Sequence, residues 1–222
     1  MCRKSPRYEC AWGWILGAPP GSGHNSRMDN ATLAIAATAA RLIAEDGLEY
    51  GPAKHQALKT LGLPARTPLP DNLVLEAALR EHLDLFCADT QPGELQALRE
   101  HAVTWMTRLA EFRPHLGGAV WRGTATRHSD IYLQLFCDDS KSAEIELINQ
   151  GIDYDVQQIR GFQGGQVDAL SVHSWCSPLK MHVGVHLMIY DHDDLRGALR
   201  LDAQGQSQRG DLSALKRLLE NS

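Results

Sequence analysis

Hydrophobic positions in the first half of the chain recur with the three- and four-residue spacing of amphipathic helices. The first predicted helix runs from the cap candidates Asp29 and Asn30 to a stop at Gly47, and a second covers residues 52–61. Asp71 is the expected cap of a third helix that ends near Cys87, and Pro92 opens a fourth. The fourth carries a continuous apolar stripe typical of a packed core face, formed by Leu95, Leu98, Ala102, Trp105, Leu109 and Phe112.

After Pro114 the pattern changes to the two-residue alternation of β-strands. Strands are predicted at residues 130–136, 153–159, 169–175 and 182–190, with helices at residues 140–151 and 211–220. This order predicts an α/β (α+β) fold in which helices flank a mixed β-sheet, preceded by an N-terminal helical region. We expect a helical region over residues 28–113 and an α/β domain over residues 114–222.

Residues 1–27 differ in composition from the rest of the chain, and a breaker-rich stretch, GAPPGSGHNSR, leads up to Met28. We interpret residues 1–27 as a flexible N-terminal extension and Met28 as the natural start. Basic residues precede the apolar stretch AWGWILGA, but this stretch is short and lacks a convincing cleavage site for an export signal. The five cysteines are scattered and form no CxxC pair, which favours a reducing, cytoplasmic location.

The charge balance narrows the range of partners. Among the 222 residues, 22 Lys and Arg stand against 27 Asp and Glu, a net charge of −5. This balance argues against broad nucleic-acid binding, since such proteins carry basic surfaces. No apolar run approaches the roughly 20 residues that cross a bilayer, so we expect no membrane association.

The stretch GAVWRGTATRHSDIYLQLF, residues 118–136, combines a glycine-spaced loop with a carboxylate before an apolar run. Gly123 follows Gly118 by five positions, and Ser129, Asp130 and Ile131 stand ahead of the strand. In these positions the chain resembles the nucleotidyltransferase superfamily of the DNA polymerase β type, in its minimal form. Leu116 and Gly117 also match the lead into the motif.

The resemblance implies a nucleotidyltransferase-like sheet with a nucleoside triphosphate as ligand or substrate and Mg²⁺ as cofactor. In that family the glycine turn holds phosphates, while two carboxylates on one strand face bind the metal during in-line attack. It implies that Asp130 is catalytic and a metal ligand. The implied nucleotide-binding residues are Gly117, Gly118, Arg122, Gly123, Arg127 and Ser129.

Two positions depart from the family pattern. Ala119 replaces a phosphate-binding serine, and Tyr132 stands at the second carboxylate position, where an uncharged phenol is a poor Mg²⁺ ligand. Asp153 and Asp155 are the candidates for a third carboxylate and for further metal ligands; His186 is the alternative if a later strand is equivalent. A two-metal site in its usual form is therefore not expected.

Three functions remain open on this pattern. The leading hypothesis is a divergent, catalytically silent protein that binds a nucleotide at the Gly118–Asp130 loop. The second is an active metal-dependent transferase that moves a nucleotidyl group to an unknown acceptor, and the third is a structural or protein-interaction domain. A zinc site at His173, Cys176, His182 and His186 is disfavoured, because histidines four apart on a strand stand roughly 13 Å from each other.

Overall fold

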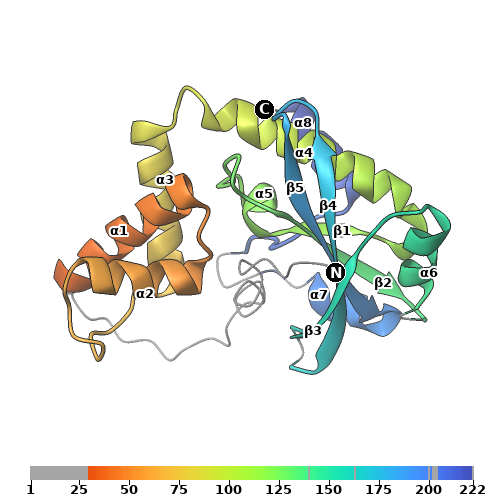
Figure 1. Ribbon diagram of the computed structural model, residues 1–222, viewed down its shortest axis with the longest axis horizontal. Helices are drawn as coiled ribbons and strands as arrows, with labels where there is room; N and C mark the ends of the chain where they lie inside the picture. The colour runs from red at the N-terminus through yellow and green to blue at the C-terminus, as the bar shows by residue number, and fades with distance from the viewer. Residues whose placement is uncertain (1–29, 140, 163, 200, 202–204, 222) are drawn as a thin grey trace. The chain divides into compact units, whose positions relative to one another are not determined.

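The computed structural model describes residues 30–221 apart from residues 140, 163, 200 and 202–204 (Figure 1). The expectations for residues 1–27, for Met28 and for the cap candidate Asp29 lie outside the described residues. The chain divides into two compact units, the first ending at Asp89 and the second beginning at Thr90. No helix among the residues described is long and apolar enough to span a membrane.

The described part of the first unit is built from three helices, α1 (Asn30–Asp46), α2 (Tyr50–Thr60) and α3 (Asn72–Phe86). Their apolar stripes meet in a core of their own, as the three- and four-residue spacing predicts. Ile35 and Ala39 of α1, Ala53 of α2 and Leu75 and Leu79 of α3 are fully buried in it. The aspartate predicted to cap α3 does so: the carboxylate of Asp71 accepts a hydrogen bond from the backbone N–H of Val74 at 2.8 Å.

We expect Asp71→Ala to lower the free energy of unfolding of the first unit by about 1 kcal/mol, because an N–H at the start of α3 loses its acceptor. Urea denaturation followed by circular dichroism measures the change. Asp71→Ser is the matched control, since a serine hydroxyl accepts the same bond. An equal loss in both variants would contradict the capping role.

The second unit contains a five-stranded mixed sheet, which confirms the predicted fold class. Its strands are β1 (His115–Gly117), β2 (Ile131–Cys137), β3 (Asp155–Arg160), β4 (Gln166–Cys176) and β5 (Met181–Asp191), in the order β1-β2-β5-β4-β3. β2 and β5 are parallel, and every other pair of neighbours is antiparallel. The late strand β5 therefore lies at the centre, beside β2.

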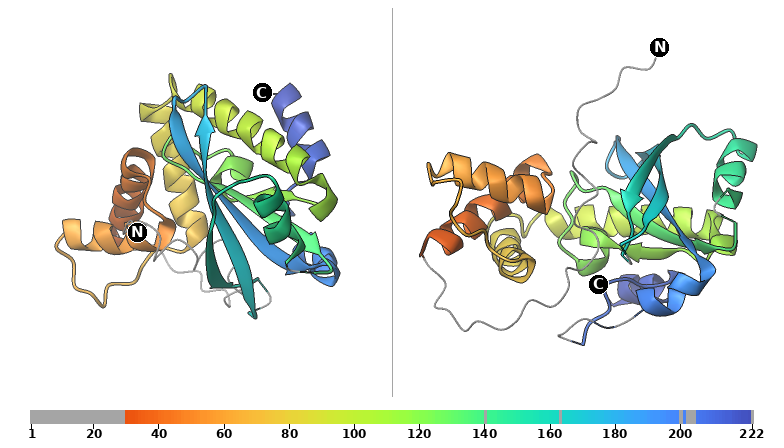
Figure 2. Two further views of the ribbon diagram at one scale, coloured as in Figure 1. Left: turned by 45° about the vertical axis from the view of Figure 1, so that its right-hand side comes forward. Right: turned by 90° about the horizontal axis from the view of Figure 1, so that it is seen from below.

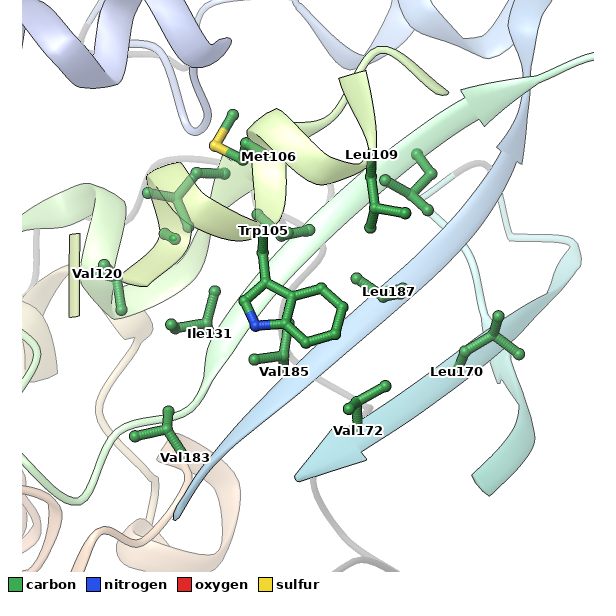
Figure 3. Packing of buried hydrophobic residues seen from close by; sticks show 14 of the residues in the cluster. Trp105, Met106, Leu109, Val120, Ile131, Leu170, Val172, Val183, Val185 and Leu187 are labelled. Carbon is green, nitrogen blue, oxygen red and sulfur yellow. The ribbon is translucent and has the colours of Figure 1, made fainter. Parts of the chain in front are cut away.

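The longest helix of the second unit, α4 (Gln91–Arg108), packs on this sheet. Figure 3 shows Trp105 of α4 over Val185 and Leu187 of β5, in the main hydrophobic core. α6 (Ser142–Asn149) and α8 (Leu212–Glu220) add Leu147 and Leu215 to the same core, and α8 lies along α4 (Figure 2). The apolar stripe of α4 thus packs in the core of the sheet, and α4 is part of the second unit. The units divide between residues 89 and 90, whereas the sequence predicted a boundary between residues 113 and 114.

The remaining short elements surround the sheet. Among the residues described, they are α5 (Gly118–Arg122), α7 (Leu195–Ala198) and the 3₁₀ turns Ala110–Phe112 and His192–Asp194. β1 and α5 were not predicted as elements from periodicity, because three and five residues are too few to show a period.

The two faces of the sheet differ in chemistry. One face of β2 and β5 carries aliphatic side chains of the main core, such as Ile131, Leu133 and Val185. On the other face, which we call the polar face, Tyr132 pairs in register with His186, and His186 with Ser171. β2 is buried on both faces, which its alternating sequence did not predict.

Candidate functional site

The candidate site begins with a tight turn between β1 and α5. Gly118 has a φ of 70° and Gly123, which ends α5, a φ of 84°, both in the left-handed region that favours glycine. A Cβ atom at Gly118 would lie 3.2 Å from the ring of Tyr132. The two motif glycines are therefore required by the backbone, and the first lets the turn approach β2 closely.

Asp130 lies directly before β2 and faces β5. Its Oδ1 accepts a hydrogen bond from the backbone N–H of Gly184 at 3.0 Å, and its Oδ2 lies 3.3 Å from Nε2 of His186. A Cβ at Gly184 would lie 2.6 Å from Oδ1, so only glycine permits this approach. Both carboxylate oxygens thus face donors on the neighbouring strand, although 36% of the Asp130 side chain is exposed.

His186 links Asp130 to a serine on the next strand. Its side chain is 1% exposed, and its Nδ1 lies 3.0 Å from Oγ of Ser171. The imidazole also stacks on Tyr132, with ring centroids 4.9 Å apart and an interplanar angle of 25°. In a neutral imidazole, an Nε2–H that donates to Asp130 leaves Nδ1 to accept from Ser171, so both ring nitrogens have a partner.

The loop between α5 and β2 is fixed by α4. Gln91 donates hydrogen bonds from Nε2 to the backbone oxygens of Gly123 and Ala125, at 3.1 and 2.9 Å. The carboxylate of Glu94 accepts from the backbone N–H of Arg127 at 2.9 Å. Ser129 accepts from the N–H of Thr126 through Oγ, at 3.1 Å. Ser129 therefore closes a turn in the loop.

The two arginines of the motif lie in different surroundings. Arg122 is the last residue of α5 and is half-buried, whereas the side chain of Arg127 is exposed. Gly117, the last residue of β1, pairs with Tyr132. Of the residues implied by the resemblance, Arg127 is thus the one with an exposed positive charge on the loop.

The candidate metal ligands do not come together. Asp155 opens β3, and β4 and β5 lie between β3 and β2, which separates Asp155 from β2 by about 14 Å across the sheet. Asp153 is exposed two residues earlier, ahead of β3. No group of three or more His, Cys, Asp or Glu side chains suited to a metal ion is found in the part of the chain that the structure describes. The side chain that contacts Asp130 from the strand beside β2 is His186, so the expected grouping of Asp130 with Asp153 and Asp155 is not formed.

The disfavoured zinc set is also dispersed. His173 pairs in register with Gly184, and His182 pairs with Trp175, so these histidines lie on different rungs of β4 and β5. His186 is already bonded to Asp130 and Ser171.

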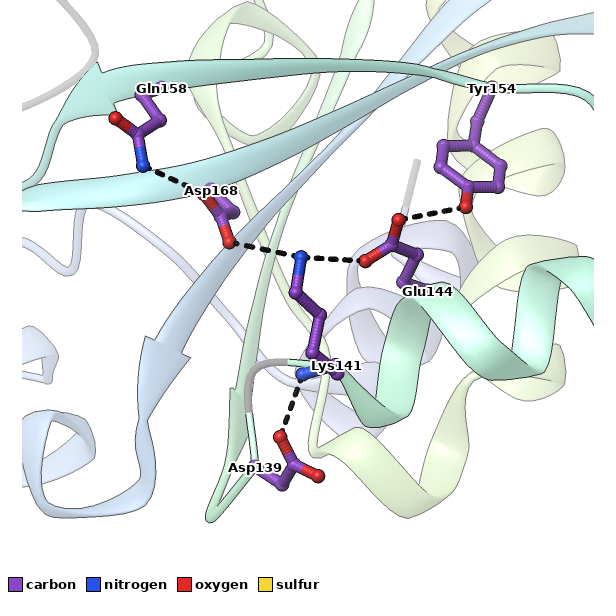
Figure 4. Close-up of polar contacts among 6 residues, drawn as sticks. All are labelled: Asp139, Lys141, Glu144, Tyr154, Gln158 and Asp168. Carbon is purple, nitrogen blue, oxygen red and sulfur yellow. Dashed lines mark hydrogen bonds and ion pairs between the residues drawn. The ribbon is translucent and has the colours of Figure 1, made fainter.

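The polar residues near β3 form a separate cluster around a lysine (Figure 4). Nζ of Lys141 lies 2.8 Å from a carboxylate oxygen of Glu144 and 3.8 Å from one of Asp168. Tyr154 donates to the other oxygen of Glu144 at 3.0 Å. The hydrogen bonds from Lys141 and Tyr154 lower the pKa of Glu144. In this cluster a lysine ammonium supplies the positive charge beside the carboxylates.

Sequence reasoning missed several residues that shape the site. Gln91, Glu94 and Ser171 reach the site from elements distant in sequence, and no local pattern indicates their partners. Gly184 was detectable in principle, because a glycine inside the strand sequence HVGVH signals close approach of another group.

Comparisons with known proteins give little further guidance. No protein-family model matches the sequence, and no curated protein matches it. Among solved structures, the chain is similar to Cid1 in complex with the UTP analogue UMPNPP, with a TM-score of 0.32 and 15% identity over 43% of this chain and 30% of that chain. A cytoplasmic RNA terminal U-transferase gives a TM-score of 0.32 and 16% identity over the same shares. The chain thus matches less than a third of the length of either neighbour, and the function of the site has to follow from its own geometry.

Proposed function

We propose that this chain is a divergent, catalytically silent protein of the nucleotidyltransferase fold that binds a nucleotide at the Gly118–Asp130 loop. The observation that carries the proposal is the position of Asp130 at the start of β2, beside a glycine-dependent strand-turn-helix unit, with Tyr132 and His186 at the flanking positions. The order of turn, short helix and carboxylate-bearing strand supports the resemblance in the sequence.

Catalytic silence is supported by the surroundings of Asp130. Metal-dependent transfer needs close carboxylates that share a divalent ion, and loss of a ligand costs much of the rate. Here a tyrosine and a histidine stack at the other two positions, and both oxygens of Asp130 face protein donors. The active alternative needs Asp153 or Asp155 beside Asp130, and the sheet order separates β2 from β3.

The same geometry supports nucleotide binding without a divalent ion. Both oxygens of Asp130 already face protein groups, the N–H of Gly184 and the imidazole of His186, which would weaken Asp130 as a metal ligand. The phosphates would then be neutralised by the protein alone, and Arg127 offers an exposed guanidinium on the loop for this purpose.

Thermal melting with each of the four nucleoside triphosphates at millimolar concentration tests the proposal. We expect at least one of them to raise the melting temperature equally in Mg²⁺, Mn²⁺ and EDTA, because a ligand that binds only the folded state stabilises it; saturation at 100 times Kd corresponds to about 2.7 kcal/mol. Arg127→Ala should remove the shift. Arg196→Ala, which removes an exposed arginine from α7, is the matched control and should retain it.

Two outcomes would overturn the proposal. A melting temperature that no nucleotide changes would leave the structural or protein-interaction alternative. Transfer of label from an α-³²P nucleotide that Asp130→Asn abolishes would establish the active transferase instead.

A further inference from the structure

A second group of side chains gathers on the polar face of the sheet, further along β2 and β5 than Asp130. We call it the Arg209 cluster; it consists of Arg209, Phe162, Tyr190, Phe136 and His115. Arg209 lies over the ring of Phe162 at 5.4 Å, and Phe162 contacts Tyr190 with ring centroids 4.7 Å apart. Tyr190 stacks on Phe136 at 5.7 Å, and His115 meets the edge of Phe136 at 5.4 Å.

The backbone explains how Arg209 reaches this face. Gly210 pairs with Leu116 at the outer edge of β1 through two hydrogen bonds, of 2.8 and 3.0 Å. Since neighbouring residues of an extended segment point to opposite faces, Arg209 points to the face opposite that of Leu116, which is the face of His115 and Phe136. The segment around Gly210 thus lies alongside the outer edge of β1 and places the side chain of Arg209 on the polar face.

Arg209 carries its charge into a buried position. The residue is 8% exposed, and its Nε and Nη1 atoms are fully buried without a hydrogen-bond acceptor in the described part of the chain. Burial lowers the pKa of Arg209, yet a guanidinium keeps its proton in proteins. The ring of Phe162 attracts the cation but accepts none of these hydrogen bonds, so the donors lack the partner that buried charges require.

A buried acceptor without a partner lies on the same face. Gln134 is 1% exposed, and its Oε1 has no donor among the residues described. Gln134 precedes Phe136 by two residues on β2 and pairs in register with His115. The cluster therefore combines unsatisfied guanidinium donors, an unsatisfied amide oxygen and aromatic rings.

The ionisable groups near Arg209 do not neutralise its charge in the part of the chain that the structure describes. Burial is the largest effect on the pKa of His115 and lowers it; the backbone oxygen of Arg113 and the charge of Asp211 raise this pKa, and the charge of Arg209 lowers it. Tyr190 is the ionisable group that acts on Arg209, and burial raises its pKa to about 12, so it stays neutral. No carboxylate within the described ranges forms an ion pair with Arg209.

We propose that the Arg209 cluster binds a phosphate-class oxyanion. Its oxygens accept hydrogen bonds from the guanidinium of Arg209, and a protonated oxygen of the anion donates to Oε1 of Gln134. A phosphate near neutral pH is partly protonated, so it offers acceptors to a guanidinium and a donor to an amide oxygen. The aromatic rings of Phe162 and Tyr190 exclude water and strengthen these bonds. The aromatic rings of the cluster lie away from Asp130, because Phe136 is six residues beyond it, about 20 Å along β2. The backbone of Arg209 lies opposite Gly117 across the antiparallel bridge between Gly210 and Leu116, so the two proposed sites are distinguished by their arginines, Arg209 and Arg127.

Thermal melting of the full chain in inorganic phosphate, against sodium chloride of equal ionic strength, tests the inference. We expect phosphate to raise the melting temperature of the native chain above the chloride value, with a saturable dependence on concentration. Arg209→Met keeps the length of the side chain and removes the charge, and it should abolish this difference. Arg127→Ala should keep it, which distinguishes the Arg209 cluster from the nucleotide loop.

A second variant covers the case in which Arg209→Met does not fold. Gln134→Leu removes the amide oxygen and should weaken the apparent phosphate affinity at least threefold while leaving the response to nucleotides intact. An equal phosphate shift in the native chain and in these variants, or no shift above chloride in the native chain, would overturn the inference. Failure of the nucleotide experiment alone leaves it standing, because the two responses depend on different arginines.

Discussion

Tyr132→Asp should lower the free energy of unfolding of the second unit by about 3–5 kcal/mol. Tyr132 is 5% exposed, and its ring contacts the imidazole of His186 and lies 3.2 Å from where a Cβ of Gly118 would be. The substitution removes that packing and places a second carboxylate two residues from Asp130, in a buried position. Urea or thermal unfolding of the purified variant measures the loss.

Tyr132→Phe is the matched control, because it keeps the ring and should cost about 1 kcal/mol for the lost hydroxyl. The test of the ancestry of the site is the double variant Tyr132→Asp with His186→Asp, which restores carboxylates at both positions beside Asp130. If the site derives from a metal-binding one, Mn²⁺ should raise the melting temperature of this double variant and not that of the native chain. Unfolding of the double variant without rescue by Mg²⁺ or Mn²⁺ would count against the resemblance.

Gly210→Ala should destabilise the second unit by about 1–3 kcal/mol, because the new methyl group would overlap a tryptophan ring. A Cβ at Gly210 would lie 2.1 Å from the indole of Trp121. That indole is held in place, since its Nε1 donates to the backbone oxygen of Ser207 at 2.8 Å. The backbone N–H and the backbone oxygen of Gly210 are both hydrogen-bonded to Leu116, so neither Gly210 nor the indole of Trp121 moves away easily.

Gly93→Ala provides the control for this prediction. Gly93 lies in the first turn of α4, and a Cβ atom at this position would have nothing within 4 Å, so alanine there should leave stability unchanged or raise it slightly. Thermal melting of both variants in parallel gives the comparison. Equal melting temperatures for the two would show that the packing of Trp121 on Gly210 adapts without cost.

Much of the fold was predictable because its signals are local. The helical stripe of α4, the cap of α3 at Asp71 and the alternation of β4 and β5 depend on residues within a few positions of each other. Each of these elements appears within a few residues of its predicted bounds. The two motif glycines were also predictable, since a left-handed backbone at Gly118 and Gly123 restricts the residue type at those positions.

The partners of Asp130 depend on the order of strands, which no local pattern specifies. Sequence alone left Asp153 and Asp155 as candidates for the place beside Asp130, with His186 as the alternative if a later strand was equivalent. The parallel pairing of β2 with β5 places His186 beside Asp130 and leaves β3 at the edge of the sheet. β5 follows β3 and β4 in the sequence and yet lies at the centre, because the order of strands along the chain does not fix their order in the sheet. The surroundings of Arg209 arise in the same way, from a segment after the last strand that pairs with β1. The sequence by itself thus determined the helices, the strands and the conformation of the glycine turn, because these depend on neighbouring residues. The contacts of both candidate sites were decided by the tertiary structure, because they depend on long-range strand pairing, for which many registers and strand orders compete in energy.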